Sequence, residues 1–271
     1  MSMTKTWSDD FALNMFNLKD KVAVITGGNG TLGAAYAQAF ALHGAKVVVT
    51  ARNMKTLEET VASVEEVGGK CVAISSDVTD PNAMQALVDK IDEQFGRIDI
   101  LVNNAGMALR EPAESMPADK FNQVMNVNVT GTLIPCQAFG KYFMKQGHGK
   151  IVNTSSVRGF CGHPDGYSAY AASKAAVDSL TKQLSTEWSL KGAKNNFTIN
   201  VNAIAPTLIK SPLTQEICED PARIAPFLAR LPMGRVAETN DMIGLVLFLS
   251  APASDFINGQ IIYVDGGCTA G

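Results

Sequence analysis

The sequence predicts an α/β protein with a single Rossmann-type, doubly wound parallel sheet and helices on both faces. Short runs rich in β-branched residues alternate with segments of helical spacing from residue 21 to near the end of the chain. Several runs, such as KVVVT at 46–50, are apolar throughout, as expected for parallel strands covered on both faces. No linker rich in Pro, Gly or Ser interrupts the alternation. We therefore expect a lead-in over residues 1–18 and one domain over 19–271.

The first βαβ unit comprises a strand at 21–26, a glycine-rich turn, a helix at 34–42 and a strand at 46–50. Every later strand is expected to follow a helix. These helices are expected at about 54–67, 81–95, 118–144, from 167 onward and at 241–250, and the strands after them at 71–78, 98–106, 150–156, 198–206 and 260–267.

Composition narrows the class of protein. The 271 residues are 46% hydrophobic, which is enough for one large core, and the net charge of −3 comes without any Lys/Arg run. Nucleic acid and anionic membranes are therefore poor partners. The N-terminus lacks the pattern of a secretory signal, and apolar runs such as 243–249 are too short to span a bilayer. These features predict a cytoplasmic protein with no membrane partner.

Cysteine and histidine usage gives no sign of a metal. The five cysteines are scattered without a C-x-x-C pair: Cys71, Cys136, Cys161, Cys218 and Cys268. Their odd number and wide spacing favour reduced thiols over disulfides or a zinc site. His43, His148 and His163 are also too widely spaced to suggest a metal site, so no catalytic metal is expected.

Tyr170 and Lys174 are four residues apart in an alanine-rich helical segment, so they should share one helix face. A nearby ammonium favours the phenolate and should lower the pKa of the tyrosine. Such a tyrosine can move a proton to or from an alcohol near neutral pH. Taken alone, the pair is also compatible with an ordinary solvated helix face.

A glycine-rich turn at 26–33, TGGNGTLG, follows the first strand and opens the first helix. This context favours dinucleotide binding, because glycines let the backbone approach a pyrophosphate at the helix N-terminus. A tight turn without a ligand is the alternative. After the second strand, Arg52 stands where NAD-selective units carry an acid, which favours NADP(H). If Arg52 is only a solvated loop cation, NAD(H) remains open as the cofactor.

These motifs together resemble the short-chain dehydrogenase/reductase family over about residues 18–267. The resemblance rests on TGGNGTLG, Asp77-Val78, NNAG at 103–106, Asn128 in NVNVTG, Ser156 in NTSSVRG, the Tyr170/Lys174 pair, VNAIAP at 201–206 and NGQIIYVDGG near the end. It implies a catalytic set in which Tyr170 is the acid/base, Lys174 lowers its pKa and holds the nicotinamide ribose, Ser156 rather than Ser155 polarises the substrate, and Asn128 holds a water of a proton relay.

The resemblance also implies the cofactor contacts. The expected cofactor-binding residues are Gly27, Asn29, Thr31, Leu32, Gly33, Arg52, Asp77, Val78, Asn103, Ala105, Gly106, Tyr170, Lys174 and Ile209. The sequence departs from the family pattern at Thr31 and Thr207, which replace usual glycines, and in a small insertion around 164–167. None of these departures removes a catalytic residue. Relatives are commonly tetramers, which implies a homotetramer here.

The substrate is expected to be a small carbonyl compound or alcohol. Arg110, shortly after NNAG, resembles the branch of gluconate 5-dehydrogenase and related sugar-acid or polyol dehydrogenases. Arg110 and Arg158 are candidate substrate contacts, since arginine binds carboxylates bidentately, although either could be a surface cation. A lid is expected over about 207–235, and its apolar residues would also suit a hydrophobic ketone or a 3-oxoacyl thioester. A nucleotide-binding protein without activity is the alternative from another class.

Overall fold

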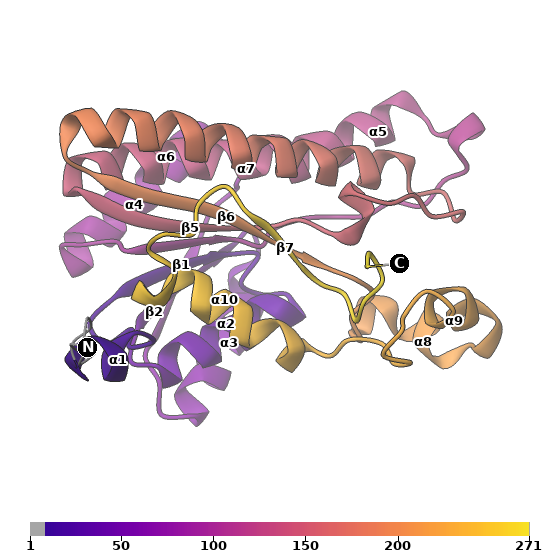
Figure 1. The fold of residues 1–271 in the computed structure, drawn as a ribbon, viewed down its shortest axis with the longest axis horizontal. Helices are drawn as coiled ribbons and strands as arrows, with labels where there is room; N and C mark the ends of the chain where they lie inside the picture. Colours follow the sequence, from indigo (N-terminus) through magenta and orange to yellow (C-terminus); the bar gives the residue numbers. More distant parts are fainter. Residues whose placement is uncertain (1–8, 271) are drawn as a thin grey trace, which may run out of the picture.

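The computed structural model describes residues 9–270, which form one seven-stranded, entirely parallel sheet (Figure 1). Its strands are β1 (Val22–Thr26), β2 (Lys46–Ala51), β3 (Cys71–Ser75), β4 (Ile100–Asn103), β5 (His148–Thr154), β6 (Thr198–Pro206) and β7 (Ile261–Val264). Their order across the sheet is β3-β2-β1-β4-β5-β6-β7. The predicted fold class is confirmed, and each of the seven strands lies within or one residue beyond its predicted range, apart from β5, which begins two residues early.

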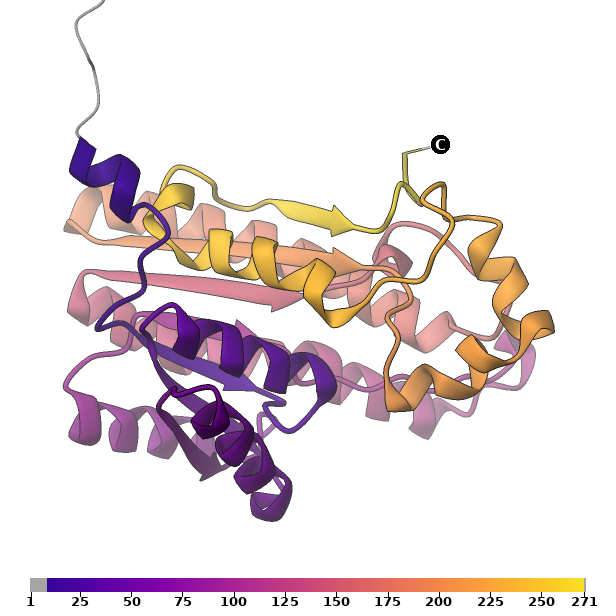
Figure 2. The same ribbon diagram turned by 90° about the horizontal axis from the view of Figure 1, so that it is seen from below.

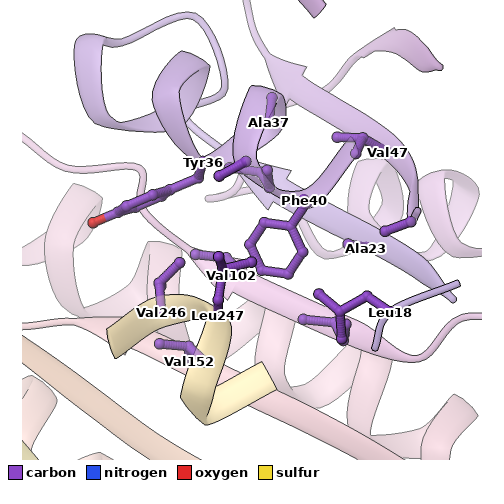
Figure 3. Close-up of a cluster of buried hydrophobic side chains, with 14 of the residues drawn as sticks. Leu18, Ala23, Tyr36, Ala37, Phe40, Val47, Val102, Val152, Val246 and Leu247 are labelled. Carbon is purple, nitrogen blue, oxygen red and sulfur yellow. The ribbon is translucent and has the colours of Figure 1, made fainter. Parts of the chain in front are cut away.

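Helices cover both faces of the sheet. They are α1 (Asp9–Asn14), α2 (Thr31–Leu42), α3 (Met54–Glu66), α4 (Pro81–Phe95), α5 (Ala118–Met125), α6 (Gly131–Gln146), α7 (Ser168–Asn195), α8 (Gln215–Glu219), α9 (Pro221–Leu228) and α10 (Thr239–Ser250). Side chains of α2, α3 and α10 form one buried cluster, part of which Figure 3 shows around Phe40. Side chains of α4, α6 and α7 form a second cluster on the opposite face. Among the described residues, no helix is long and apolar enough to cross a membrane.

Local chemistry explains why some predicted helix ends are accurate. Helix α4 begins after Asp80, whose side chain accepts hydrogen bonds from the backbone N–H groups of Asn82 and Ala83. Pro81 occupies the first helical position, where its missing N–H costs nothing. Gly96 ends the helix in the left-handed conformation, with φ of 67°. Start and stop signals of this kind can be read directly from the sequence.

The predicted continuous helix at 118–144 is wrong in one respect. The structure contains a π-helical turn, Asn126–Thr130, between α5 and α6. The extra residue in this turn changes the phase of the helix, and the turn places Asn128 in the interior. Periodicity alone could not predict the break, because all three segments are helical and continuous along the chain.

The carboxyl ends of the strands meet along one edge of the sheet. The chain reverses its direction of travel across the sheet between β1 and β4, the place where doubly wound folds bind ligands. The segment 207–235, which contains α8 and α9, lies beyond this edge beside the ends of β6 and β7 (Figure 2). The candidate site therefore lies between the strand ends and this segment.

Candidate active site

A cavity of about 390 Å³ lies at the carboxyl ends of β1–β4. Seven of the predicted cofactor contacts line it: Gly27, Asn29, Arg52, Asp77, Val78, Ala105 and Gly106. The remaining wall comes partly from α5 and the π-helical turn, through Gln123, Asn126 and Val127. These helical residues have no motif of their own, and only the fold brings them to the cavity.

The glycine-rich turn is packed too tightly for side chains at its two ends. A Cβ on Gly27 would lie 2.8 Å from the Cα of Ala105, and Gly27 adopts a φ of +60°. A Cβ on Gly33 would lie 2.3 Å from the carbonyl oxygen of Gly27. Gly30 precedes α2 and offers no side chain to cap its first N–H groups. Those N–H groups are suited to an anion, so the turn fits a dinucleotide pyrophosphate.

Polar side chains surround the cavity beyond this turn. Arg52 is exposed at its rim and makes no ion pair with the residues between 9 and 270. The carboxylate of Asp77 accepts hydrogen bonds from the backbone N–H and hydroxyl of Thr79, and these bonds lower its pKa. Asn29 donates to the Thr56 hydroxyl at 3.0 Å. Among the described residues Arg52 therefore has no ion-pair partner within 4.0 Å, although its charge also lowers the pKa of Asp77.

Other predicted cofactor residues lie outside the walls of this cavity. Asn103 is buried, and its side chain donates to Asn153 at 2.9 Å rather than facing the cavity. Leu32 packs against the core, and Ile209 pairs with Ala237 in an isolated bridge. Thr31 begins α2. Their contacts with a cofactor stay predictions.

Two residues connect the NNAG segment to the glycine-rich turn, and the sequence did not predict this role for either of them. The hydroxyl of Thr26 accepts hydrogen bonds from the backbone N–H groups of Asn104 and Ala105, each at 3.1 Å. The side chain of Asn104 donates to the carbonyl oxygen of Gly27 at 3.1 Å. The NNAG segment is thereby tied to the glycine-rich turn. The one sequence feature that could have indicated this role is the hydroxyl of Thr26, which ends β1 directly before the glycines.

Tyr170 and Ser156 meet beside the nucleotide cavity. Tyr170 lies in the first turn of α7, and Ser156 follows β5. The Ser156 hydroxyl donates to the Pro206 carbonyl oxygen at 3.3 Å and lies near enough to the Tyr170 phenol to favour its ionised form and so lower its pKa. Ser155 instead hydrogen-bonds the carbonyl oxygen of Lys174. Ser156, and not Ser155, is therefore the serine that affects the Tyr170 phenol, while its role toward the substrate stays a prediction.

Lys174 is buried one helical turn beyond Tyr170, with only 5% of its surface exposed. Its Nζ donates to the Thr154 carbonyl oxygen at 2.6 Å and lies 5.5 Å from the centre of the Tyr170 ring. Burial lowers the pKa of Lys174 to about 8, while the charge of Asp178 raises it. The ammonium is therefore desolvated and makes no ion pair shorter than 4.0 Å among residues 9–270.

Burial acts on the pKa of Tyr170 in the opposite direction to the effect expected from Lys174. Burial raises the pKa of Tyr170 and outweighs the effects of the Ser156 hydroxyl and of the Arg158 charge, which both lower it. Desolvation of the phenolate is the largest effect. The contribution of Lys174 to this pKa stays a prediction. Tyr170 is consequently protonated at neutral pH and can donate a proton.

Asn128 is held rigidly by the π-helical turn. Its side-chain oxygen accepts from the Met107 backbone N–H at 2.8 Å, and its amide donates to the Met107 carbonyl and to Ser173, each at 2.9 Å. The Ser173 hydroxyl in turn donates to the Tyr170 carbonyl at 2.7 Å. Asn128 thus connects the segment after β4 with the helix that carries Tyr170. Ser173 is a supporting residue that the sequence analysis did not single out.

The two arginines proposed as substrate contacts have different environments. The guanidinium of Arg110 is exposed and lies 4.9 Å from the centre of the Tyr167 ring. Arg158 is buried, and it donates to the carbonyl oxygen of Gly162 at 3.0 Å. A third arginine, Arg230 after α9, donates to the same oxygen at 3.0 Å. Arg230 was not predicted, and its 68-residue separation from Gly162 left no local signal.

The strand order and the tyrosine–serine–lysine group define a nucleotide-dependent oxidoreductase of the short-chain type. A family model described as enoyl-(acyl carrier protein) reductase matches residues 28–269. The chain therefore belongs to the short-chain dehydrogenase/reductase family and is an NAD(P)-dependent oxidoreductase, with dehydrogenase relatives that act on hydroxyl groups.

Relatives cover almost the whole chain. It is 40% identical to 2-dehydro-3-deoxy-D-gluconate 5-dehydrogenase of Dickeya dadantii (strain 3937) over 95% of this chain and 99% of that protein. It is 37% identical to 3-oxoacyl-[acyl-carrier-protein] reductase of Thermotoga maritima over 92% of this chain and 98% of that protein. The crystal structure of a gluconate 5-dehydrogenase from Burkholderia cenocepacia J2315, in complex with NADP and tartrate, is similar to this structure with a TM-score of 0.89. The two chains are 33% identical, and the match covers 96% of this chain and 99% of that one.

Proposed function

We propose that this protein is an NADP(H)-preferring dehydrogenase of a sugar acid, which interconverts a secondary alcohol and a ketone. The observation that carries this proposal is the arrangement of three side chains: Ser156 lies near Tyr170, and the buried Lys174 follows Tyr170 by one helical turn. This group lies beside a nucleotide cavity whose rim carries the unpaired Arg52. Similarity to 2-dehydro-3-deoxy-D-gluconate 5-dehydrogenase and to a gluconate 5-dehydrogenase with bound NADP supports the choice of substrate and cofactor.

The residues of the cavity fit NADP(H). The uncapped start of α2 and the tight backbone at Gly27 and Gly33 suit the pyrophosphate. Arg52 would bind the 2′-phosphate, which is the group that distinguishes NADP(H) from NAD(H). Lys174 would hold the nicotinamide ribose hydroxyls. The bound cofactor supplies or accepts the hydride.

The chain itself moves the proton. In the reducing direction, the protonated phenol of Tyr170 would donate its proton to the oxygen that develops negative charge. The Ser156 hydroxyl would donate a hydrogen bond to the same oxygen and stabilise it. In the oxidising direction, the phenol must first ionise. The positive charge of Arg158 favours the phenolate, and the nearby ammonium of Lys174 would add to this effect. Asn128 would position a water in the relay that returns the proton to solvent.

The remaining parts of the proposal concern the surroundings of the site. Residues 207–235 would form the substrate lid, and Arg110 would contact the substrate from the rim. We further propose that the protein is a cytoplasmic homotetramer without a nucleic-acid partner. Polyols and simple ketones are additional candidate substrates, in line with a broader carbonyl reductase activity.

A second candidate function is reduction of 3-oxoacyl thioesters. The specific observation in its favour is the 37% identity to a 3-oxoacyl-[acyl-carrier-protein] reductase. The buried apolar residues of the lid, Ile217 and Phe227, would then face an acyl chain. The cationic surroundings of Arg158 and Arg230 favour an acid over an uncharged acyl chain.

Initial rates distinguish these functions. Oxidation of gluconate, mannitol and sorbitol with NADP⁺ or NAD⁺ would be compared with reduction of 5-ketogluconate, fructose, an acetoacetyl thioester and a hydrophobic ketone with NADPH or NADH. The proposal predicts the highest kcat/KM for a sugar acid with the NADP(H) pair. Activity on thioesters or hydrophobic ketones alone would replace the proposed substrate class. NADPH binding without turnover of any compound would favour a binding protein.

A further inference from the structure

A cavity of about 660 Å³ lies at the carboxyl edge of the sheet, separate from the nucleotide cavity. Three segments far apart in the sequence form its walls: the loop 161–164 that follows Ser156, residues 229–232 after α9, and the turn 267–268 after β7. The ring centre of His163 in its wall lies 5.3 Å from that of Tyr167, whose centre lies 6.1 Å from that of Tyr170, so this cavity lies near the catalytic group. A small substrate that reacts at Tyr170 can extend toward it.

Two arginines meet at one backbone oxygen in the wall of this cavity. Arg158 and Arg230 each donate an Nη1–H to the Gly162 carbonyl oxygen at 3.0 Å, so the two guanidinium groups lie within two hydrogen-bond lengths of each other. Arg158 is only 8% exposed. Like charges repel, and a buried charge is costly unless an opposite charge accompanies it. A shared carbonyl oxygen carries only a partial negative charge.

No carboxylate in the described part of the chain pairs with either arginine within 4.0 Å. The nearby Asp265 accepts hydrogen bonds from Gly267 and Thr269, which occupy both of its oxygens. Asp165 lies 3.5 Å from His163 and is half exposed. Arg230 lines the cavity and Arg158 contacts Gly162 in its wall, so the two arginines bring positive charge to this wall, and neither acid pairs with them.

His163 is a second, independent sign of a ligand at this place. It lines the same cavity, its side chain is 1% exposed, and its buried Nε2 has no hydrogen-bond partner in the structure described here. The ring is stacked on Phe227 of α9 with 4.5 Å between centroids. Burial and the surrounding charges of Arg158, Arg230 and Arg110 lower its pKa, which keeps the ring neutral. An unpartnered ring nitrogen beside unpaired cations suits an anionic, hydroxylated ligand.

Arg158 is also joined to the catalytic group. Its backbone N–H donates to the Ser156 hydroxyl oxygen at 3.2 Å. Its positive charge lowers the pKa of Tyr170. Arg158 therefore contacts Ser156 through its backbone and Gly162 in the cavity wall through its guanidinium. An anion held by Arg158 would have a fixed position relative to the reacting carbon.

We propose that Arg158 and Arg230 form the binding site for the substrate's carboxylate, and that this pair selects acids over neutral polyols. The inference rests on the proposed function and names the residues that choose the substrate. Arg158 is the buried, fixed half, while Arg230 is exposed and can turn from Gly162 toward the ligand. Arginine is suited to this task because its planar fork binds a carboxylate bidentately.

The test uses Arg230→Ala and Arg230→Lys, with Arg223→Ala as the matched control, because Arg223 is exposed on α9 and pairs with Glu216 instead. Arg230→Ala should raise KM for a sugar acid by about tenfold or more, the size of one lost charged hydrogen-bond pair. The kcat and the KM for mannitol should stay within about twofold. Arg230→Lys should retain part of the affinity, and Arg223→Ala all of it. Equal KM values for gluconate in Arg230→Ala and the natural protein would overturn the proposal.

A binding measurement separates this inference from the proposed function. Gluconate is titrated by calorimetry into protein saturated with NADPH, where both compounds are reduced and no turnover occurs, with mannitol as the neutral probe. The proposal expects gluconate binding that Arg230→Ala and Arg158→Gln weaken. If no sugar acid is turned over but this binding is seen and depends on Arg230, the arginine site stands while the function fails. If sugar acids are turned over but their binding ignores both substitutions, the function stands and the arginine site is wrong.

Discussion

The two halves of the carboxyl edge satisfy their polar groups in different ways. At the ends of β1–β4, the buried hydroxyl of Thr26 and the amide of Asn104 are hydrogen-bonded within the chain. Beyond β5, Lys174 and Arg158 are buried cations that have only backbone carbonyls or a thiol as partners among residues 9–270. Because an unpaired buried charge destabilises a fold, we expect a bound ligand to supply the partners of Lys174 and Arg158. Internal hydrogen bonds fix the backbone of the first half, whereas the second half contains buried positive charges.

The largest expected effect lies where the two halves meet. Tyr170→Phe removes the hydroxyl that contacts Ser156 but keeps the ring and its packing. We expect kcat to fall about 10³-fold, as for loss of a general acid, while NADPH affinity changes less than about twofold. Stopped-flow rates and fluorescence titration of NADPH measure the two quantities. A matching loss of NADPH affinity would show that the phenol belongs to the nucleotide half.

The same division explains what could be predicted from the sequence. Gly27, Gly33 and the four-residue spacing of Tyr170 and Lys174 are local signals, because a turn or a helix face is encoded by neighbouring residues. The sheet follows from its apolar runs. The meeting of Arg230 with Gly162 depends on how α9 folds over the edge, and no neighbouring residue encodes it.

The π-helical turn and the tyrosine pKa were missed for related reasons. The turn at Asn126–Thr130 becomes visible only when Asn128 is seen to hydrogen-bond Met107 and Ser173. The pKa of Tyr170 depends on burial, which the sequence does not give, whereas the neighbouring lysine was evident. Sequence patterns can therefore propose reacting groups, whereas their burial and hydrogen-bond partners come only from the fold.

The second effect tests the buried charge of Lys174. The folded protein lowers the pKa of this lysine from 10.5 to about 8, so between these pH values the unfolded chain binds more protons. The contribution of Lys174 to the free energy of unfolding should therefore rise with pH across this window, by about 3 kcal/mol in total. Urea denaturation from pH 7 to 10 measures it as the difference between the natural protein and Lys174→Met.

Lys191→Met is the control for this measurement, since Lys191 is exposed on the same helix. Its stability relative to the natural protein should not change with pH. If the stability difference between the natural protein and Lys174→Met is also independent of pH, the ammonium is not desolvated. Lys174 would then not support the contrast between the two halves.

The third effect concerns the packed shape of the nucleotide half. The Cβ added by Gly33→Ala would lie 2.3 Å from the Gly27 carbonyl oxygen and 2.8 Å from the Cα of Gly28, so the backbone must move. We expect a loss of about 1–3 kcal/mol of stability and about tenfold weaker NADPH binding. Thermal unfolding and fluorescence titration measure both. Gly244→Ala, at an open position in α10, should instead stabilise by about 0.5–1 kcal/mol. Unchanged NADPH binding in Gly33→Ala would separate the turn from the cofactor.

The smallest effect asks whether the nucleotide half also keeps a cation for an outside partner. Arg52 is exposed and unpaired at the rim of the smaller cavity. Its charge distinguishes it from the Thr50 hydroxyl and the Asn103 side-chain oxygen, which are uncharged and buried in the same half without a partner among the described residues. Arg52→Ala should raise KM for NADPH about tenfold, because a charged contact with the 2′-phosphate is lost, and should leave KM for NADH unchanged. Lys55→Ala removes a nearby exposed charge that does not line the cavity and should change neither value. Equal effects of Arg52→Ala on both cofactors would mean that Arg52 contributes only general attraction, and that cofactor choice is made elsewhere at this edge.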